Sequence, residues 1–305
     1  MSRRDSLLHG VLIVDKPQGM TSHDVVQRLR RIARTSRVGH AGTLDPMATG
    51  VLVVMIGEGT KLGPYLTAEN KRYEARVQLG RGTDTLDAEG QVTEQGPLPD
   101  WWPEARQEPL EHALDIERCR TEQIPPVYSA IKIGGESSHA LARRGEALEL
   151  AARPVRVASL VTVATDAEGW VDLTLDVSKG YYVRSLARDL GVSVGSPAHL
   201  TALRRAASGR FTLEHAETLA EFERTPSKLT ERLLPVHDAA ALALPLARLT
   251  TDGVVRARQG KRLADDDFTE LPESVGASAW LDPTGALVAV GHRDGEALRI
   301  LRGFF

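Results

Sequence analysis

The sequence predicts an α+β protein in which helices flank a mixed, largely antiparallel sheet, with a small β-rich module at the C-terminal end. Apolar and polar residues alternate over 71–80 and 170–177, as they do in strands with one buried face. The run 51–56 is wholly apolar and follows a glycine, which is typical of a strand buried on both faces. A chain of 305 residues is long enough for two domains, which we place at 1–240 and 246–305.

The first part of the chain predicts a strand followed by an amphipathic helix. Residues 10–14 are an apolar strand that runs into a turn at 15–19. Ser22 is a candidate N-cap for a helix whose apolar stripe consists of Val25, Val26, Leu29, Ile32 and Ala33. Arginines 28, 31 and 34 lie on the far side of this helix. They form either an ordinary solvated face or, next to an active site, a ridge that contacts phosphates, and the pattern leaves both interpretations open.

The middle of the chain supplies further strands and a second amphipathic helix. The segment 154–163 is rich in β-branched residues, and another strand covers roughly 200–206. Residues 179–184 end the strand 170–177 and enter a helix. The buried positions of that helix are predicted to be Val183, Leu186, Ala187 and Leu190.

Helices are also predicted at 104–116 and 216–234. Between these, 120–150 is mixed and polar, which indicates an excursion from the sheet rather than a part of it. Pro235 and Pro245 flank an alanine- and leucine-rich link, and the turns beyond it indicate a β-rich module.

The composition predicts a soluble protein with unevenly distributed charge. No apolar run approaches the length of a bilayer span, and no N-terminal segment has the pattern of a secretory signal. The single cysteine, Cys119, excludes an internal disulfide and a cysteine-based metal site. The net charge is −3, yet residues 1–40 carry eight Lys/Arg against three Asp, and residues 84–122 carry eleven acidic against three basic side chains. This asymmetry indicates one positive surface suited to phosphates, although solvated charge runs are the simpler interpretation.

Several classes of enzyme find no support in the sequence. The nine histidines are scattered, without HxxxH or HExxH spacing, so no metal site is predicted. No Walker loop, GxGxxG fingerprint or GxSxG elbow is present. Nucleotide hydrolysis, dinucleotide redox chemistry and hydrolysis by a nucleophilic serine are therefore not indicated.

The most informative segment is 38–50, which reads VGHAGTLDPMATG. Glycines and Pro46 place Asp45 on a tight loop, directly before the buried strand 51–56. A carboxylate in such a loop is suitably placed to act on a ligand. Taken alone, however, an aspartate on a Gly/Pro loop is more often a turn residue that accepts hydrogen bonds from its own backbone.

This segment closely resembles the signature loop of the TruB family of pseudouridine synthases, GH-x-G-x-LDP-x-A-x-G. Further family segments follow in order, with KRY at 71–73 and a match to KG-x-Y-[IV]-R at 179–184. The resemblance covers roughly residues 9–210. Within it, residues 120–150 are similar to the family's RNA-binding insertion. Beyond it, residues 253–260 are similar to part of a PUA domain.

The resemblance implies catalytic roles for Asp45, Tyr73 and Arg184. Asp45 would be the nucleophile, because an ionised carboxylate can attack the uridine and leave again. Tyr73 would stack on the flipped base near the C5 proton, and Arg184 would pair with Asp45. The simpler interpretations are a core tyrosine for Tyr73 and a surface arginine at a helix start for Arg184.

The resemblance also implies substrate-binding residues. Tyr182 would pack behind the Asp45–Arg184 pair, and Leu203 would form an apolar wall of the base pocket. His40 would occupy the space left by the flipped base, unless it is a solvated loop histidine. The candidate set is completed by Lys16 and Asp87, in segments that match the family, and by Arg31 and Arg34 of the arginine ridge.

The activity implied is the conversion of uridine to pseudouridine at position 55 in the T loop of transfer RNA, on a pseudouridine synthase fold with a PUA-like C-terminal domain. Attack by Asp45 at C1′ of the ribose or at C6 of the base remains open. No cofactor is expected, because an isomerisation needs no redox agent or group donor. The expected partner is the T arm of tRNA, with no membrane and no obligatory protein partner, and the enzyme is expected to be a cytoplasmic monomer.

Two rivals remain. A guide-RNA-dependent pseudouridine synthase shares the catalytic loop, but the insertion at 120–150 and the lack of long basic tails disfavour it. A tRNA-folding chaperone or binding protein would not need Asp45, Tyr73 and Arg184 together, although chaperoning alongside catalysis stays possible.

Overall fold

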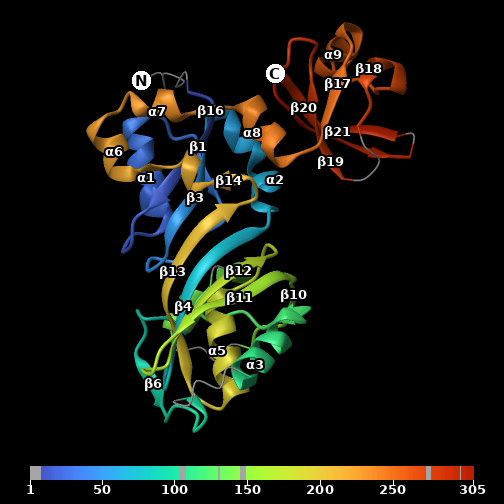
Figure 1. The fold of residues 1–305 in the computed structure, drawn as a ribbon. Coiled ribbons are helices and arrows are strands. Elements are labelled where there is room, and N and C mark those ends of the chain that lie inside the picture. Colours follow the sequence, from blue (N-terminus) through green and yellow to red (C-terminus); the bar gives the residue numbers. More distant parts are fainter. Residues whose placement is uncertain (1–7, 103–107, 130, 145–148, 273–275, 296) are drawn as a thin grey trace. The chain divides into compact units, whose positions relative to one another are not determined.

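A computed structural model describes residues 8–102, 108–129, 131–144, 149–272, 276–295 and 297–305. The chain divides into two compact units (Figure 1). Unit 1 comprises the described parts of Met1–Pro46, Gly50–Glu69 and Ser208–Phe305. Unit 2 comprises the described parts of Met47–Thr49 and Asn70–Ala207.

The sheet of unit 1 is built around strand β1 (Gly10–Lys16). Antiparallel β3 (Thr49–Ile56) pairs with β1 along its whole length, and β2 (Val38–Ala41) pairs antiparallel with β3. The short strands β15 (Glu217–Thr218) and β16 (Leu234–Pro235) also pair with β1, one parallel and one antiparallel. The predicted mixed sheet with flanking helices is confirmed.

Strand β3 is the centre of the core of unit 1, as the apolar run 51–56 predicts. All its residues after Thr49 are buried. Val51, Val53 and Met55 share one hydrophobic cluster with Val11 and Ile13 of β1. The chain leaves β3 through a 3-10 helix, η1 (Gly57–Leu62), and helix α2 (Gly63–Thr67).

Helix α1 (Ser22–Ile32) begins one residue earlier than predicted, because Thr21 and not Ser22 is its N-cap. The Thr21 hydroxyl accepts a hydrogen bond from the Asp24 N–H at 3.0 Å, and the Asp24 carboxylate accepts one from the Thr21 N–H at 2.9 Å. This reciprocal pair is a capping box. Ser22 is buried, and its hydroxyl bonds to the main chain of Leu44 instead.

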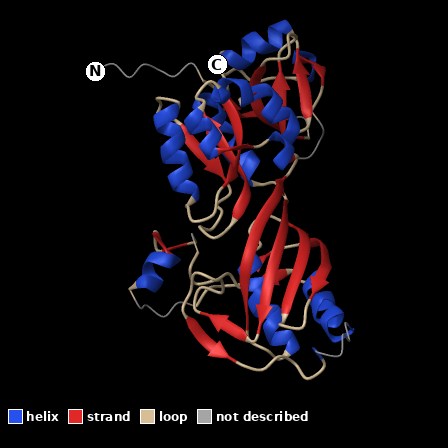
Figure 2. Ribbon diagram, turned by 60° about the vertical axis from the view of Figure 1, so that its left-hand side comes forward, coloured by secondary structure: helices blue, strands red, loops and turns tan. Residues whose placement is uncertain are grey.

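Unit 2 contains a sheet in the order β11, β12, β4, β13 (Figure 1). Figure 2 draws the strands in red and the helices in blue. Strands β11 (Val157–Thr165), β12 (Trp170–Val177) and β4 (Lys71–Leu79) pair antiparallel, and β13 covers Ala198–Ser208. The predicted alternation holds on β4 and β12, where every second residue is buried. Their exposed faces are joined by the ion pairs Arg72–Asp176 and Arg76–Asp172.

Two helices pack on each other and on this sheet: α3 (Glu108–Arg118) and α5 (Val183–Val194) (Figure 1). The buried residues of α5 include all four that the sequence predicts. Among the described residues of 120–150, none joins the main sheet, which agrees with the predicted excursion. The minor elements of unit 2 are β5 (Arg81–Thr83), β6 (Val92–Gln95), β7 (Glu122–Gln123), β8 (Lys132–Ile133), β9 (Glu136–Ser137), α4 (Ser138–Arg143) and β10 (Arg153–Pro154).

The single helix predicted over 216–234 is wrong. Two short helices, α6 (Leu219–Arg224) and α7 (Lys228–Arg232), lie there. Pro226 separates them, since proline disfavours the helical conformation of the preceding residue, and Thr225 has φ −132° and ψ 81°. The alanine-rich link that follows is itself a helix, α8 (Val236–Ala243).

The C-terminal module is a five-stranded sheet in the order β18, β17, β19, β20, β21, with helix α9 (Thr251–Arg258) against it. One cluster around Trp280 lies wholly inside the module. A second cluster joins its residues Leu281 and Val290 to Val11 of β1 and Ala240 of α8. The remaining elements of unit 1 are β14 (Phe211–Thr212), η3 (Leu213–His215), β17 (Leu246–Leu249), η4 (Asp265–Asp267), β18 (Phe268–Glu270), β19 (Ala277–Leu281), β20 (Leu287–Asp294) and β21 (Ala297–Gly303).

Among the described residues, no helix combines the length and apolarity needed to cross a bilayer.

Replacing Thr21 by alanine is expected to loosen the first turn of α1. The variant loses the oxygen that accepts from Asp24, and loss of an N-cap side chain costs about 1 kcal/mol. Hydrogen exchange of the α1 amides, converted to a free energy of opening, measures the effect. Thr21→Ser keeps the hydroxyl and is the matched control. Equal protection of α1 in the alanine variant and in the wild type would contradict the capping role.

Candidate active site

The Asp45 loop of unit 1 connects two neighbouring antiparallel strands. It leaves β2 after Ala41 and enters β3 at Thr49. Asp45 is half-buried, and the side chains of Leu44 and Met47 on either side of it are buried. The loop therefore has apolar anchors on both sides of a carboxylate that keeps partial access to solvent.

Ser22 holds the residue before Asp45. Its hydroxyl accepts a hydrogen bond from the Leu44 N–H at 2.8 Å and donates one to the Leu44 carbonyl at 3.1 Å. Ser22 and Leu44 are both buried. One hydroxyl thus satisfies both main-chain groups of Leu44, and this fixes the direction in which the chain enters Asp45.

Lys16 holds the residue after Asp45. Its side chain is fully buried at 0% exposure, and Nζ donates to the carbonyls of Pro17 at 2.8 Å, Met20 at 2.6 Å and Pro46 at 3.3 Å. The Gly19 N–H also donates to the Pro46 carbonyl, at 2.8 Å. A buried ammonium is costly unless it is hydrogen-bonded, and these carbonyls meet that need. The side chain of Lys16 is therefore buried against the main chain of the loop and does not lie on the surface.

His40 and the arginine ridge lie elsewhere in unit 1. His40 is half-buried in strand β2, opposite Val54, so the alternative of a loop histidine is wrong. Arg31 and Arg34 are exposed, and neither has an acidic partner among the described residues. Arg28, in contrast, forms an ion pair with Glu223 at 2.9 Å.

Arg184 is the most constrained candidate in unit 2. It is the second residue of α5 and only 4% exposed, so the alternative of a surface arginine is wrong. Its guanidinium donates to the carbonyls of Thr85 at 3.0 Å and Tyr128 at 2.9 Å, and lies 3.6 Å from the Asp87 carboxylate. These acceptors offset the unfavourable position of a cation at a helix N-terminus. The expected partner of Arg184, Asp45, belongs to unit 1, and their pairing stays a prediction.

Asp87 is buried together with Arg184. Its carboxylate also accepts from the Thr85 hydroxyl at 2.6 Å and from the Glu89 N–H at 3.0 Å. The family resemblance implies only a supporting role for Asp87 and does not predict its contact with Arg184. Matching segments far apart in the sequence cannot show which carboxylate lies beside which cation.

The aromatic and apolar candidates also lie in unit 2. Tyr73 is buried on β4, opposite Leu175 of β12, and Leu203 is buried on β13. Tyr182 is half-buried and is the N-cap residue of α5. Unit 2 therefore contains Tyr73, Arg184, Tyr182, Leu203 and Asp87, and unit 1 contains Asp45, His40, Lys16, Arg31 and Arg34.

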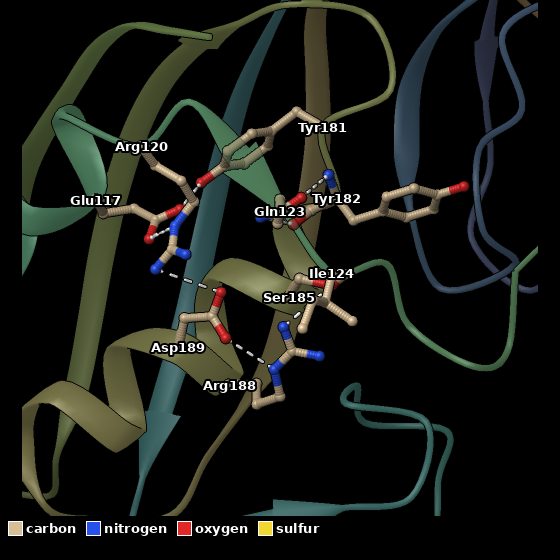
Figure 3. Close-up of polar contacts among 9 residues, drawn as sticks. All are labelled: Glu117, Arg120, Gln123, Ile124, Tyr181, Tyr182, Ser185, Arg188 and Asp189. Atoms are coloured by element: carbon tan, nitrogen blue, oxygen red, sulfur yellow. Dashed lines mark hydrogen bonds and ion pairs between the residues drawn. The ribbon is translucent and has the colours of Figure 1, made fainter. Parts of the chain in front are cut away.

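A polar network next to Tyr182 is not predicted by any motif of the sequence (Figure 3). The Tyr181 hydroxyl donates to Glu117 at 2.6 Å, and Arg120 pairs with Glu117 and with Asp189. Burial raises the pKa of the Glu117 carboxyl, against the lowering effect of its hydrogen bonds from Tyr181 and Arg120. Burial, reinforced by Glu117, also raises the pKa of Tyr181 far above its usual value. The sequence contains one signal of this network. Glu117 continues the apolar face of helix α3 that is formed by Leu110, Ala113 and Leu114, where a charged residue is unexpected.

No group of three or more His, Cys, Asp or Glu able to hold a metal ion occurs among the described residues.

The family assignment follows from sequence comparison. The sequence model of the TruB family pseudouridylate synthase N-terminal domain matches residues 30–183, which include the Asp45 loop and Tyr73. The chain belongs to the TruB family. The tRNA pseudouridylate synthase B C-terminal domain matches residues 184–241. The predicted family, and with it the class of enzyme, is confirmed.

Curated TruB relatives are similar over nearly the whole chain. A tRNA pseudouridine synthase B of Mycobacterium sp. (strain KMS) is 44% identical over 92% of this chain and 91% of its own length. Proteins with the same name in Arthrobacter sp. (strain FB24) and Nocardia farcinica are 41% and 43% identical, over 93% and 98% of this chain and 92% and 91% of their own lengths.

Solved structures support the TruB-type fold. A Cbf5-Nop10-Gar1 complex contains a chain that matches with a TM-score of 0.76 at 23% identity, over 100% of this chain and 88% of that one. An H/ACA RNP bound to a substrate RNA containing 2′-deoxyuridine matches with a TM-score of 0.72 at 23% identity, over 97% and 85%. At this identity the likeness is one of fold.

Replacing Ser22 by alanine is expected to release the start of the Asp45 loop. The buried Leu44 N–H loses its acceptor, which costs about 1–3 kcal/mol. Hydrogen exchange at the Leu44 amide should accelerate by roughly ten-fold or more. Ser36→Ala, at an exposed position, is the control. Unchanged exchange at Leu44 would show that Ser22 does not hold the loop.

Proposed function

We propose that this protein converts uridine to pseudouridine at position 55, in the T loop of transfer RNA. The observation that carries the proposal is the Asp45 loop: a family-specific segment in which the residues on both sides of the carboxylate are held by buried polar side chains. Relatives at 40–44% identity are named tRNA pseudouridine synthase B, which supports tRNA as the substrate.

Asp45 acts as the nucleophile in this proposal. An ionised carboxylate attacks either C1′ of the ribose, which expels the uracil, or C6 of the base, which weakens the glycosidic bond. The base then turns and is rejoined to the ribose through C5, and the bond to Asp45 breaks. C5 loses its proton, and N1, which is no longer bonded to the ribose, takes up a proton. Atoms balance within the nucleotide, so the reaction needs no cofactor.

Tyr73 and Arg184 assist this chemistry. Tyr73 supplies an aromatic face for the flipped uracil and a hydroxyl that can relay the C5 proton. Arg184 supplies a fixed positive charge for the carboxylate chemistry. Two main-chain carbonyls hold it in one orientation.

Binding of the T arm is proposed to use the exposed end of the arginine ridge. Arg31 and Arg34 lack acidic partners among the described residues and can approach phosphates without breaking an ion pair. Tyr182, Leu203 and His40 are proposed to line the place of the flipped base. Lys16 and Asp87 are proposed to act through the groups that they hold, Pro46 and Arg184.

A tritium-release assay tests the proposal. The substrate is a bare T-arm hairpin labelled at C5 of its uridines, with no guide RNA added. Release of one tritium per hairpin, from the position equivalent to 55, is expected. Release only in the presence of a guide RNA would favour the guide-dependent rival. Binding of the hairpin without release would favour a chaperone or binding protein.

Asp45→Asn is expected to abolish turnover and to leave RNA binding within about two-fold of wild type, since the amide keeps the size but loses the charge needed for attack. Single-turnover tritium release and a filter-binding titration measure the two properties. Asp266→Asn, at an exposed position in the C-terminal module, is the control for removal of one carboxylate. Residual isomerisation at a few per cent of wild type would rule out Asp45 as the nucleophile.

Arg31→Gln and Arg34→Gln, each alone, are expected to weaken hairpin binding and to lower the slope of log Kd against log salt by about 0.7–0.9 per lost phosphate contact. Binding titrations at several salt concentrations measure this slope. Arg224→Gln is the control, since Arg224 is exposed but paired with Glu221. A slope unchanged from wild type would show that Arg31 and Arg34 do not contact phosphates and form an ordinary solvated helix face.

A further inference from the structure

We propose that Gln123 is a positioning residue of the active site: its side-chain amide fixes the main chain of Tyr182 and thereby the first turn of α5, which carries Arg184. The inference rests on the proposed function, because it concerns two residues that the proposal places at the substrate. Gln123 lies in strand β7, at the start of the 120–150 insertion, and is only 2% exposed.

The Gln123 amide binds both main-chain groups of a single residue. Its Oε1 accepts from the Tyr182 N–H at 2.8 Å, and its Nε2 donates to the Tyr182 carbonyl at 3.1 Å (Figure 3). This two-point contact restricts both the position and the rotation of the peptide groups around Tyr182. A neutral amide suits the task, because it offers one acceptor and one donor at the same end of the side chain.

Tyr182 is a position where such support is needed. It is the N-cap of α5, and its own side chain makes no capping hydrogen bond. N-terminal helix residues have main-chain groups without partners inside the helix, and an untethered first turn frays. Gln123 provides a partner from a strand distant in sequence. The Tyr182 ring points away from the Glu117 network, in the direction opposite to Tyr181 (Figure 3).

The residues that follow Gln123 continue the contact along α5. The Ile124 carbonyl accepts from the Ser185 hydroxyl at 2.9 Å and from the Arg188 guanidinium at 3.1 Å. The Tyr128 carbonyl accepts from Arg184 at 2.9 Å. The first residues of the insertion, 123–128, therefore offer several hydrogen-bond acceptors to α5. Gln123 makes the first of these contacts along the chain.

The neighbouring Tyr181 provides a matched control. Its hydroxyl makes a buried hydrogen bond to Glu117, one residue before the Gln123 contact. Tyr181→Phe removes that bond but leaves Glu117 paired with Arg120 and the Tyr182 main chain bound to Gln123. A general loss of stability in this region would lower kcat alike in Tyr181→Phe and in a variant of Gln123. A positioning role of Gln123 would lower kcat only in the Gln123 variant.

The experiment compares wild type, Gln123→Met, Gln123→Glu and Tyr181→Phe in the full-length protein, using the C5-labelled T-arm hairpin. Methionine keeps the length of glutamine and loses both hydrogen bonds. Glutamate keeps the acceptor for the Tyr182 N–H but loses the donor to its carbonyl. We expect kcat to fall by about 10- to 100-fold in Gln123→Met with KM within about two-fold, because small misplacements of catalytic groups have effects of this size. Gln123→Glu should fall at least as far as Gln123→Met, because it buries a carboxylate that faces the Tyr182 carbonyl oxygen. Tyr181→Phe should stay within about three-fold of wild type.

Hydrogen exchange of the peptide covering 179–188, measured without RNA, gives a readout that does not depend on activity. Faster exchange in Gln123→Met, with wild-type exchange in Tyr181→Phe, supports the proposal. Equal exchange in Gln123→Met and wild type overturns it, as does a kcat of Gln123→Met within three-fold of wild type. If the wild type itself fails to release tritium, the proposed function fails, while the exchange comparison still decides whether Gln123 holds Tyr182.

Discussion

The buried ammonium of Lys16 is the group on which the Asp45 loop depends. The proposed role of Asp45 as a nucleophile requires its carboxylate to stay partly open to solvent, so burial of the side chain does not fix it. The loop is fixed instead through the main chain of its neighbours, by Lys16 at Pro46 and by Ser22 at Leu44. A charge inside the protein is tolerated only when acceptors surround it, and this makes the local geometry stiff.

The same device recurs in unit 2. Arg184 is held by the carbonyls of Thr85 and Tyr128, and the main chain of Tyr182 is held by the amide of Gln123. In each case a long polar side chain reaches the main chain of a distant segment. Such contacts are directional, whereas apolar packing is not, so they define where a functional group points. Apolar packing supplies the frame, as β3 does in unit 1.

These contacts also explain which predictions from the sequence were right. Strands β3, β4 and β12 followed from the order of apolar residues alone, because burial of a strand face is recorded in its own sequence. The predicted N-cap at Ser22 was wrong, because the Ser22 hydroxyl binds the main chain of Leu44. The single helix predicted over 216–234 was wrong, because Pro226 interrupts it. Most candidate residues came from family motifs, but their partners depended on contacts between segments far apart in the sequence, such as Arg184 and Thr85, which are 99 residues apart.

The acceptors of Arg184 have a consequence for the insertion. Of its two carbonyl partners, Thr85 belongs to the segment that carries Asp87, whereas Tyr128 belongs to the 120–150 insertion. Any displacement of Tyr128 removes one charged hydrogen bond from the guanidinium, worth about 1.5–3 kcal/mol. The orientation of Arg184 is therefore coupled to the position of the insertion through the Tyr128 carbonyl. Gln123 lies near the start of the same segment and holds the main chain of Tyr182. We therefore expect a displacement of Tyr128 to change the position of the first turn of α5 only slightly.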